Sequence, residues 1–140
     1  MRKNAEVLPS AILCSSVGAF MPVELRPALA LRLMHDIGMG MVRDMKLESV
    51  PDFTLRQLTI LLTVYLEPPP HTVRGLAAKL GVTKPVITRA LDSMGKQELV
   101  TRRRDDRDKR NVIIQRTVKG ALYLEALGDM VSDRAKALPM

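Results

Sequence analysis

The stretch "TVRGLAAKLGVTKPVITRALDSMGKQ", residues 72–97, carries the signals of two short helices joined by a tight turn. Thr72 and Thr83 are residue types that cap helix N-termini, and Pro85 fits the first turn of the second helix. Between the helices, Gly81 can adopt the positive φ of a tight turn. The residues expected to pack the helices together are Leu76, Ala77, Leu80, Val82, Ile87 and Ala90. The stretch therefore predicts a helix-turn-helix, with an ordinary helical hairpin as the alternative.

The side of the second helix that faces away from this packing is polar and mostly basic. Lys84, Arg89 and Lys96 lie along it, with Asp92 among them. Cationic and hydroxyl side chains on an exposed helix are suited to contact the base edges and phosphates of a nucleic acid. We expect such contacts from Thr83, Lys84, Pro85, Thr88, Arg89 and Lys96.

The following stretch, "LVTRRRDDRDKRNVIIQRT" at residues 99–117, predicts a hairpin. Residues 99–103 and 111–116 favour strands, and every residue from 103 to 110 is charged. A hairpin after such a helix is a wing, whose cations can reach phosphates or the minor groove. We expect Asp105, Asp106 and Asp108 to pair with neighbouring arginines, with Asp105 and Asp108 orienting the tip. The cations assigned to the nucleic acid are Arg103, Arg104, Arg107, Lys109 and Arg110.

The formal charge of the chain is concentrated in its middle third. The 140 residues include 22 Lys or Arg and 15 Asp or Glu, which gives a net charge of +7. Residues 68–116 contain twelve of these cations and five of these acids, so the whole excess lies in this segment. Such concentration indicates a polyanionic partner, because an ordinary solvated surface would spread its charges.

The flanking segments are expected to be helical. Residues 24–47 carry an apolar stripe and predict a long helix loosened around Gly38 and Gly40. Thr54 and Gln57 form a capping-box pattern before a buried helix that ends at the prolines from 68 onward. We predict a mainly α fold with a small β-hairpin (α+β), a winged helix-turn-helix. Its expected parts are an N-terminal arm at 1–22, a long helix at 23–48, the winged helix-turn-helix domain at 51–117 and a C-terminal helix at 118–140.

Residues 51–120 resemble the MarR family of winged helix-turn-helix transcriptional regulators. The resemblance rests on "TLRQLTILL", "LAAKLGVTKPVITRALDSM", "LVTRR", "DDRDKR" and "TVKG" in this order. It implies that the helix from Thr83 lies in the major groove of double-stranded DNA. The family's wing reads roughly Asp-x-x-Asp-Arg-Arg, and here the matching residues are Asp105, Asp108, Lys109 and Arg110. The resemblance implies that Arg110 approaches the minor groove and is steadied by Asp108.

The same resemblance implies a homodimer on an inverted repeat. The family usually adds two helices after "TVKG", whereas residues 121–140 are enough for one, so we predict a short variant with a reduced C-terminal dimerisation region. We therefore expect the long N-terminal helix to supply part of the interface, with packing of the chain's own core as the alternative. The expected interface residues are Leu25, Leu29, Leu33, Ile37, Leu124, Leu127 and Val131.

Other function classes find little support in the residues. An enzyme needs a nucleophile beside a base or a carboxylate pair in an apolar pocket, but the acids here lie among arginines. A single-strand binder needs stacking rings, but no aromatic residue lies in the basic segment 68–116. Two alternatives stay open: an architectural protein that coats DNA with little sequence preference, and a winged helix that binds another protein.

No cofactor or metal site is predicted. His35 and His71 lack neighbouring ligands, and no Lys or Arg lies near Cys14 to activate its thiol. A small-molecule effector is compatible with the resemblance, but no residue pattern supports one. Methionines 34, 39, 41 and 45 are expected to fill the core rather than to line a ligand pocket. We predict no membrane span and no exported leader, and a cytoplasmic, nucleoid-associated location.

Overall fold

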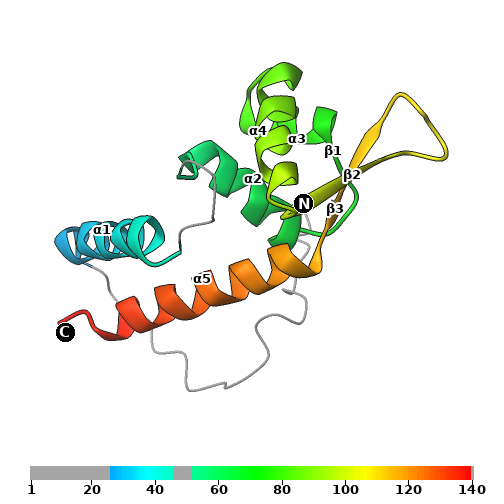
Figure 1. Ribbon diagram of the computed structural model, residues 1–140. Coiled ribbons are helices and arrows are strands. Elements are labelled where there is room, and N and C mark those ends of the chain that lie inside the picture. The colour runs from blue at the N-terminus through cyan, green and yellow to red at the C-terminus, as the bar shows by residue number, and fades with distance from the viewer. Residues whose placement is uncertain (1–25, 46–51, 140) are drawn as a thin grey trace, which may run out of the picture.

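The structure, a computed structural model, describes residues 26–45 and 52–139. The N-terminal arm, Cys14 and Leu25 lie outside the described residues. The elements are α1 (Pro27–Arg43), α2 (Leu55–Leu66), β1 (His71–Thr72), α3 (Val73–Leu80), α4 (Lys84–Lys96), β2 (Val100–Arg104), β3 (Val112–Arg116) and α5 (Val118–Lys136). Helices α2, α3 and α4 pack together beside the small sheet, and α1 lies along the far part of α5 (Figure 1). The predicted fold class, a mainly helical winged helix-turn-helix, is confirmed.

The sheet is antiparallel, with strand order β1-β3-β2. Strands β2 and β3 form the predicted hairpin, with Val100 opposite Arg116 and Arg104 opposite Val112. The sequence did not reveal β1, because a strand of two residues is too short to carry an alternating pattern. Its His71 pairs with Ile114, so β3 is the central strand.

The predicted helix ends are largely confirmed. Thr54 and Gln57 form the full capping box of α2, and the Thr72 side chain accepts the N–H of Gly75 at the start of α3. Gly81 ends α3 with φ 65°, the left-handed conformation that the turn requires. Thr83 is the N-cap residue of α4, but its side chain makes no capping hydrogen bond. Its hydroxyl therefore has no structural partner in the helix start.

Helix α1 is continuous through both of its glycines, so the expected loosening at Gly38 and Gly40 is wrong. Gly40 is buried where α1 crosses α5, and a Cβ there would overlap with the Met130 side chain. The glycine is explained by this close approach of two helices rather than by a bend. Met41 and Met45 pack against the core as predicted, but Met34 and Met39 are exposed.

The core lies between α2, α3, α4, the sheet and the first half of α5. Ile60, Leu61, Ile87, Leu91 and Met94 are completely inaccessible to solvent. Helix α5 adds Leu124 and Leu127, which are 9% and 6% exposed. Burial of this kind stabilises a domain by about 25 cal/mol for each Å² of apolar surface removed from water. Helix α4 and the wing are therefore attached to a well-packed body.

One buried hydroxyl joins three parts of this body. The Tyr65 side chain is 1% exposed, and its hydroxyl accepts the N–H of Thr117 at 2.8 Å. The same hydroxyl lies 2.8 Å from the carbonyl oxygen of Leu99 and 3.0 Å from that of Thr117, either of which can accept its proton. Gly120 passes so close that a Cβ there would overlap with the Tyr65 hydroxyl and the Leu99 carbonyl oxygen. This contact fixes the start of α5 against α2.

Glu98 links α4 to β2 and is a non-glycine residue with positive φ, 59°. That conformation costs about 1–2 kcal/mol for a residue with a Cβ. We expect Glu98→Gly to raise the free energy of unfolding by up to about 1 kcal/mol, because relief of strain exceeds the added flexibility of the unfolded chain. Chemical denaturation measures the change.

The control for this substitution is Glu98→Gln, which keeps the Cβ and removes the charge that lies 3.6 Å from Lys119 Nζ. Both partners of this ion pair are largely exposed, so we expect the control to change stability by less than about 0.5 kcal/mol. If Glu98→Gly lowered the stability, the strain argument would be wrong.

Candidate nucleic-acid interface

Helix α4 presents the predicted polar face to solvent. Its other side holds Ile87, Leu91 and Met94 in the core. Thr88 is only half-exposed, and its hydroxyl donates to the Lys84 carbonyl oxygen at 3.1 Å, so this hydroxyl already has a partner. The exposed predicted contact residues are Thr83, Lys84, Pro85, Arg89 and Lys96.

An ion pair connects α4 to the wing. Arg102 on β2 donates to Asp92 Oδ1 at 2.6 Å. Asp92 was expected on the outer face of the helix, and it lies there with 49% of its side chain exposed. Because its carboxylate is engaged by Arg102, Asp92 adds little repulsion toward an approaching phosphate. Sequence reasoning missed this pair, since ten residues and a turn separate its members.

Two of the three aspartates of the wing hold its backbone rather than its arginine side chains. Asp105 Oδ1 accepts the N–H of Arg107 at 3.0 Å, and Asp108 Oδ1 accepts the N–H of Arg110 at 3.0 Å. These are the local turns that aspartate forms with the N–H two residues onward. Of the three aspartates, Asp106 alone makes an ion pair within the described residues, at 3.4 Å from Arg103. The expected pairing of Asp105 and Asp108 with arginine side chains is therefore corrected to backbone capping.

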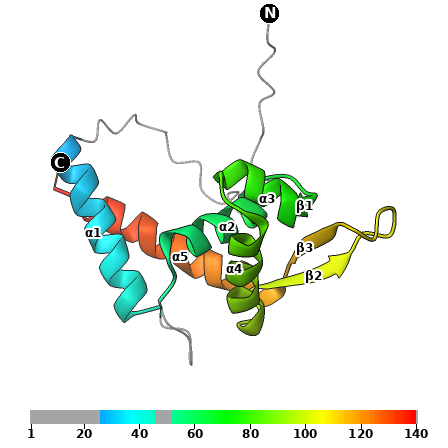
Figure 2. The same ribbon diagram turned by 90° about the horizontal axis from the view of Figure 1, so that it is seen from above.

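This arrangement leaves most wing cations uncompensated. All five predicted wing cations are exposed. Arg103 pairs with Asp106, whereas the others make no ion pair with any residue in the described ranges: Arg104, Arg107, Lys109 and Arg110. The tip of the hairpin is consequently a fixed loop that carries four free positive charges. The wing projects away from the body, at the opposite end of the molecule from α1, as Figure 2 shows from above.

Arg116, a cation of the same segment, is an exposed residue whose guanidinium is bonded to the protein's own backbone. Its Nε donates to the Val64 carbonyl oxygen at 2.8 Å and a terminal nitrogen donates to that of Glu67 at 2.9 Å. Neighbouring His71 lies 3.1 Å from the same Glu67 oxygen through Nε2. Burial, and next the charge of Arg116, lower the pKa of His71 below its ordinary value of 6.5. The ring is therefore neutral at pH 7 and adds no charge to the surface.

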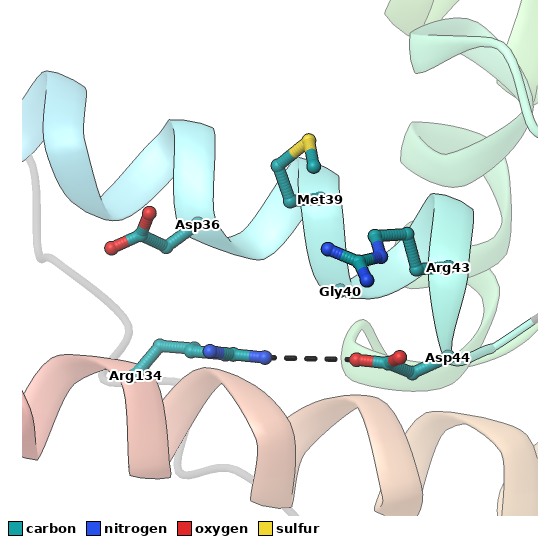
Figure 3. A pocket seen from close by; sticks show the side chains of 6 residues that line it. All are labelled: Asp36, Met39, Gly40, Arg43, Asp44 and Arg134. Atoms are coloured by element: carbon teal, nitrogen blue, oxygen red, sulfur yellow. Dashed lines mark ion pairs between the residues drawn. The ribbon is translucent and has the colours of Figure 1, made fainter.

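A crevice of about 280 Å³ separates α1 from α5 (Figure 3). Its lining includes Arg43 and Arg134, together with Asp36 and Asp44. Arg134 lies 3.6 Å from Asp44, while Asp36 lies 3.3 Å from Arg32. Positive and negative charges are balanced here, so the crevice does not extend the basic surface of α4 and the wing.

The structure places the predicted interface residues mostly against the chain itself. Leu124 and Leu127 belong to the core, and Val131 packs against it. On α1, the residues expected at the interface are half-buried, namely Leu29, Leu33 and Ile37. They lie on the same side of the helix as Gly40, and Gly40 contacts Met130 of α5. Their contact with a second chain stays a prediction. The large exposed apolar residues of α1 are others, namely Leu31, Met34, Met39 and Val42.

Within residues 26–45 and 52–139, no helix is long and apolar enough to cross a membrane. In the same ranges, no group of three or more His, Cys, Asp or Glu side chains could hold a metal ion.

A sequence model of the MarR family matches residues 53–112. The matched segment runs from just before α2 to the first residue of β3, and it contains the whole helix-turn-helix and the charged tip of the wing. The helix-turn-helix and most of the wing of this chain therefore match the MarR family. Members of the MarR family are DNA-binding transcriptional regulators and not enzymes. The resemblance drawn from the sequence motifs is thus confirmed.

Solved structures of MarR-like proteins share this fold. The transcriptional regulator Tm0710 from Thermotoga maritima superposes with a TM-score of 0.63 and 22% identity, over 78% of this chain and 71% of that one. BldR, a transcriptional regulator from Sulfolobus solfataricus, is 28% identical, with a TM-score of 0.53 over 76% of this chain and 73% of its own. Reduced AbfR bound to DNA is 25% identical, with a TM-score of 0.58 over 79% and 72%. No curated protein sequence gives a significant match.

Proposed function

We propose that this chain regulates transcription by recognising a specific sequence in duplex DNA, with α4 in the major groove and the wing directed to the minor groove. The observation that carries the proposal is the fixed wing tip with four free cations beside the exposed basic face of α4. A helix can read base edges in the major groove, and arginines favour the negative potential of a narrow minor groove. The similarity to reduced AbfR, which was crystallised bound to DNA, supports the same reading.

Selection of bound duplexes from a random-sequence DNA pool, at about physiological salt, tests this function. Enrichment of an inverted repeat with half-sites about one helical turn apart is expected, since paired recognition helices meet the same groove face at that spacing. Binding that is tight and salt-dependent but without enrichment would favour an architectural DNA-coating protein. Absence of binding to any duplex would favour the winged helix as a protein-binding module.

Arg89 is the best candidate for direct base recognition on α4. It is exposed and makes no ion pair with any other described residue. We expect Arg89→Ala to reduce discrimination at one or two base pairs of the selected site by roughly 1–3 kcal/mol, because a bidentate arginine contact to guanine is lost. Binding to single-base variants of the site measures this. An equal loss of affinity on every duplex would reassign Arg89 to a phosphate contact.

We also infer that the chain binds its DNA as a homodimer, with the outward face of α1 in the interface. Residues spaced by seven and four positions share one face of a helix, as Leu31, Gly38 and Val42 do on α1. Gly40 lies two positions from Gly38 and from Val42, about half a helical turn away, so it is on the opposite face. Leu31 and Met34 are each 68% exposed, and Val42 is 44% exposed. Exposed apolar side chains gathered on one helix face are suited to a protein interface. The interface proposed here is thus on the side of α1 opposite to the residues first expected.

The double substitution Leu31→Asp and Val42→Asp is expected to weaken self-association at least 100-fold, because two charges would be buried between the chains. Sedimentation equilibrium measures the change. Leu55→Asp is the matched control, since Leu55 is 79% exposed on α2 and lies outside the proposed interface. Unchanged self-association in the double variant, with both proteins folded, would place the interface elsewhere. The predicted cytoplasmic, nucleoid-associated location rests on the proposed function.

A further inference from the structure

Arg116 stands at the base of the wing, where β3 returns to the body of the protein. It is the last residue of β3 and pairs with Val100, the first residue of β2. Its guanidinium reaches back across the fold to two carbonyl oxygens at the end of α2, those of Val64 and Glu67. Carbonyl groups at a helix C-terminus lack intrahelical partners and carry partial negative charge, so a planar cation with several donors suits them. The guanidinium also lies 5.9 Å from the ring centre of Tyr65.

The Tyr65 side chain provides the second attachment at the point where the wing joins the body. Its hydroxyl contacts Leu99, which precedes β2, and Thr117, which follows β3. Thr117 Oγ1 in turn donates to the Glu98 carbonyl oxygen at 2.6 Å. Both strands of the wing are therefore fastened to α2 at the point where they leave the body. Beyond this point β2 is exposed from Thr101 onward, and the other links between the hairpin and the body include the pairing of β1 with β3 and the Arg102–Asp92 ion pair.

We propose that Arg116 is a positioning residue for DNA recognition: with Tyr65, it sets the direction in which the wing leaves the body and so which flanking base pairs the wing meets. This proposal rests on the proposed function for its DNA readout. Arg116 belongs to the basic segment by sequence and is exposed, but its Nε and one terminal nitrogen donate to carbonyl oxygens at the end of α2. The wing cations act on DNA, and Arg116 acts through them.

A phosphate contact and a positioning contact respond differently to Arg116→Lys and Arg116→Gln. Lysine keeps the charge but cannot donate from one planar fork to two separate carbonyl oxygens. If Arg116 positions the wing, both variants should lose roughly tenfold in discrimination at the flanking base pairs, where groove shape is read, while central discrimination stays within about twofold. The slope of log K against log salt should then stay the same, because no phosphate contact is removed.

The opposite pattern would overturn the proposal. If Arg116 contacted a phosphate, Arg116→Lys would bind almost normally, and Arg116→Gln would reduce the salt slope by about 0.9 for each chain. Arg104 supplies the matched comparison, because it is exposed on β2 and makes no ion pair with another described residue. Arg104→Lys and Arg104→Gln should follow the phosphate pattern. If a glutamine variant unfolds, the two lysine variants, Arg116→Lys and Arg104→Lys, carry the comparison: reduced flanking discrimination is expected in the first and nearly normal binding in the second.

A measurement without DNA separates this proposal from the proposed function. Spin labels at Arg107→Cys in the wing and Gly128→Cys in α5, with Cys14→Ser to remove the native thiol, report the distance from the wing to the body. A narrow distance distribution is expected in the parent protein, and a shifted or broadened one after Arg116→Lys. An unchanged distribution would refute the positioning role, whether or not the protein binds duplex DNA. Failure of the parent protein to bind DNA would instead refute the proposed function and leave the distance result standing.

Discussion

Gly120→Ala is expected to lower the free energy of unfolding by about 3 kcal/mol, since overpacking and the loss of buried hydrogen bonds each cost about 1–3 kcal/mol. The new methyl group would overlap with the Tyr65 hydroxyl and with the backbone oxygen of Leu99. Neither atom can move aside easily, because the tyrosine ring is buried and the oxygen belongs to the main chain. Chemical denaturation should give the stability change, and thermal unfolding a decrease in Tm of roughly 10 °C.

Gly128→Ala is the control on the same helix. A Cβ at Gly128 would meet no atom within 4 Å, so alanine should there increase stability by up to about 1 kcal/mol through its higher helix propensity. The two variants make the same chemical change in α5 and should move stability in opposite directions. If Gly120→Ala lost less than about 1 kcal/mol, the Tyr65 contact would not be the rigid junction described here.

Local signals were enough to predict the helix-turn-helix and the hairpin. Thr54, Thr72 and Gly81 act through hydrogen bonds or backbone angles within a few residues, so their roles can be read directly from the sequence. The charged tip between two β-prone runs was equally local. These features set the position of α4 and of the wing, which is why the elements that carry the candidate residues could be predicted, while the role of each residue stays a prediction.

Contacts between distant residues were not predictable in the same way. Tyr65 meets Thr117 across 52 positions of the chain, and Arg116 reaches α2 across a similar distance in sequence. In the sequence, Arg116 is one of the twelve cations of the basic segment, and its charge alone does not distinguish it from the cations of the wing. The role of the apolar stripe on α1 was also open, because a stripe in the sequence does not tell whether it meets α5 or a second chain. Gly40 and Met130 settle which side faces α5.

Replacing Arg104, Arg107, Lys109 and Arg110 together by glutamine is expected to reduce DNA affinity roughly 10³-fold at physiological salt, if about two phosphate contacts per chain come from the wing. For a dimer that neutralises about four phosphates per chain, the parent slope of log K against log salt should be near −7, and the variant slope about half of that. Folding should be preserved, because all four side chains are exposed and make no ion pair with other described residues. Titration of a selected duplex at several salt concentrations measures both effects.

A control with the same loss of charge separates contact from general attraction. The control residues lie away from the wing (Figure 2): Arg26 at the N-cap of α1, Arg32 and Arg43 on α1, and Lys136 at the end of α5. Their joint replacement by glutamine changes the net charge by the same amount but should alter the salt slope by less than about 1, since no counterion is released from a contacted phosphate there. Equal weakening by both sets would mean that net charge alone attracts the DNA. A large effect confined to the wing set would mean that these four cations contact the duplex, from a tip whose backbone is held by the Asp105 and Asp108 turns.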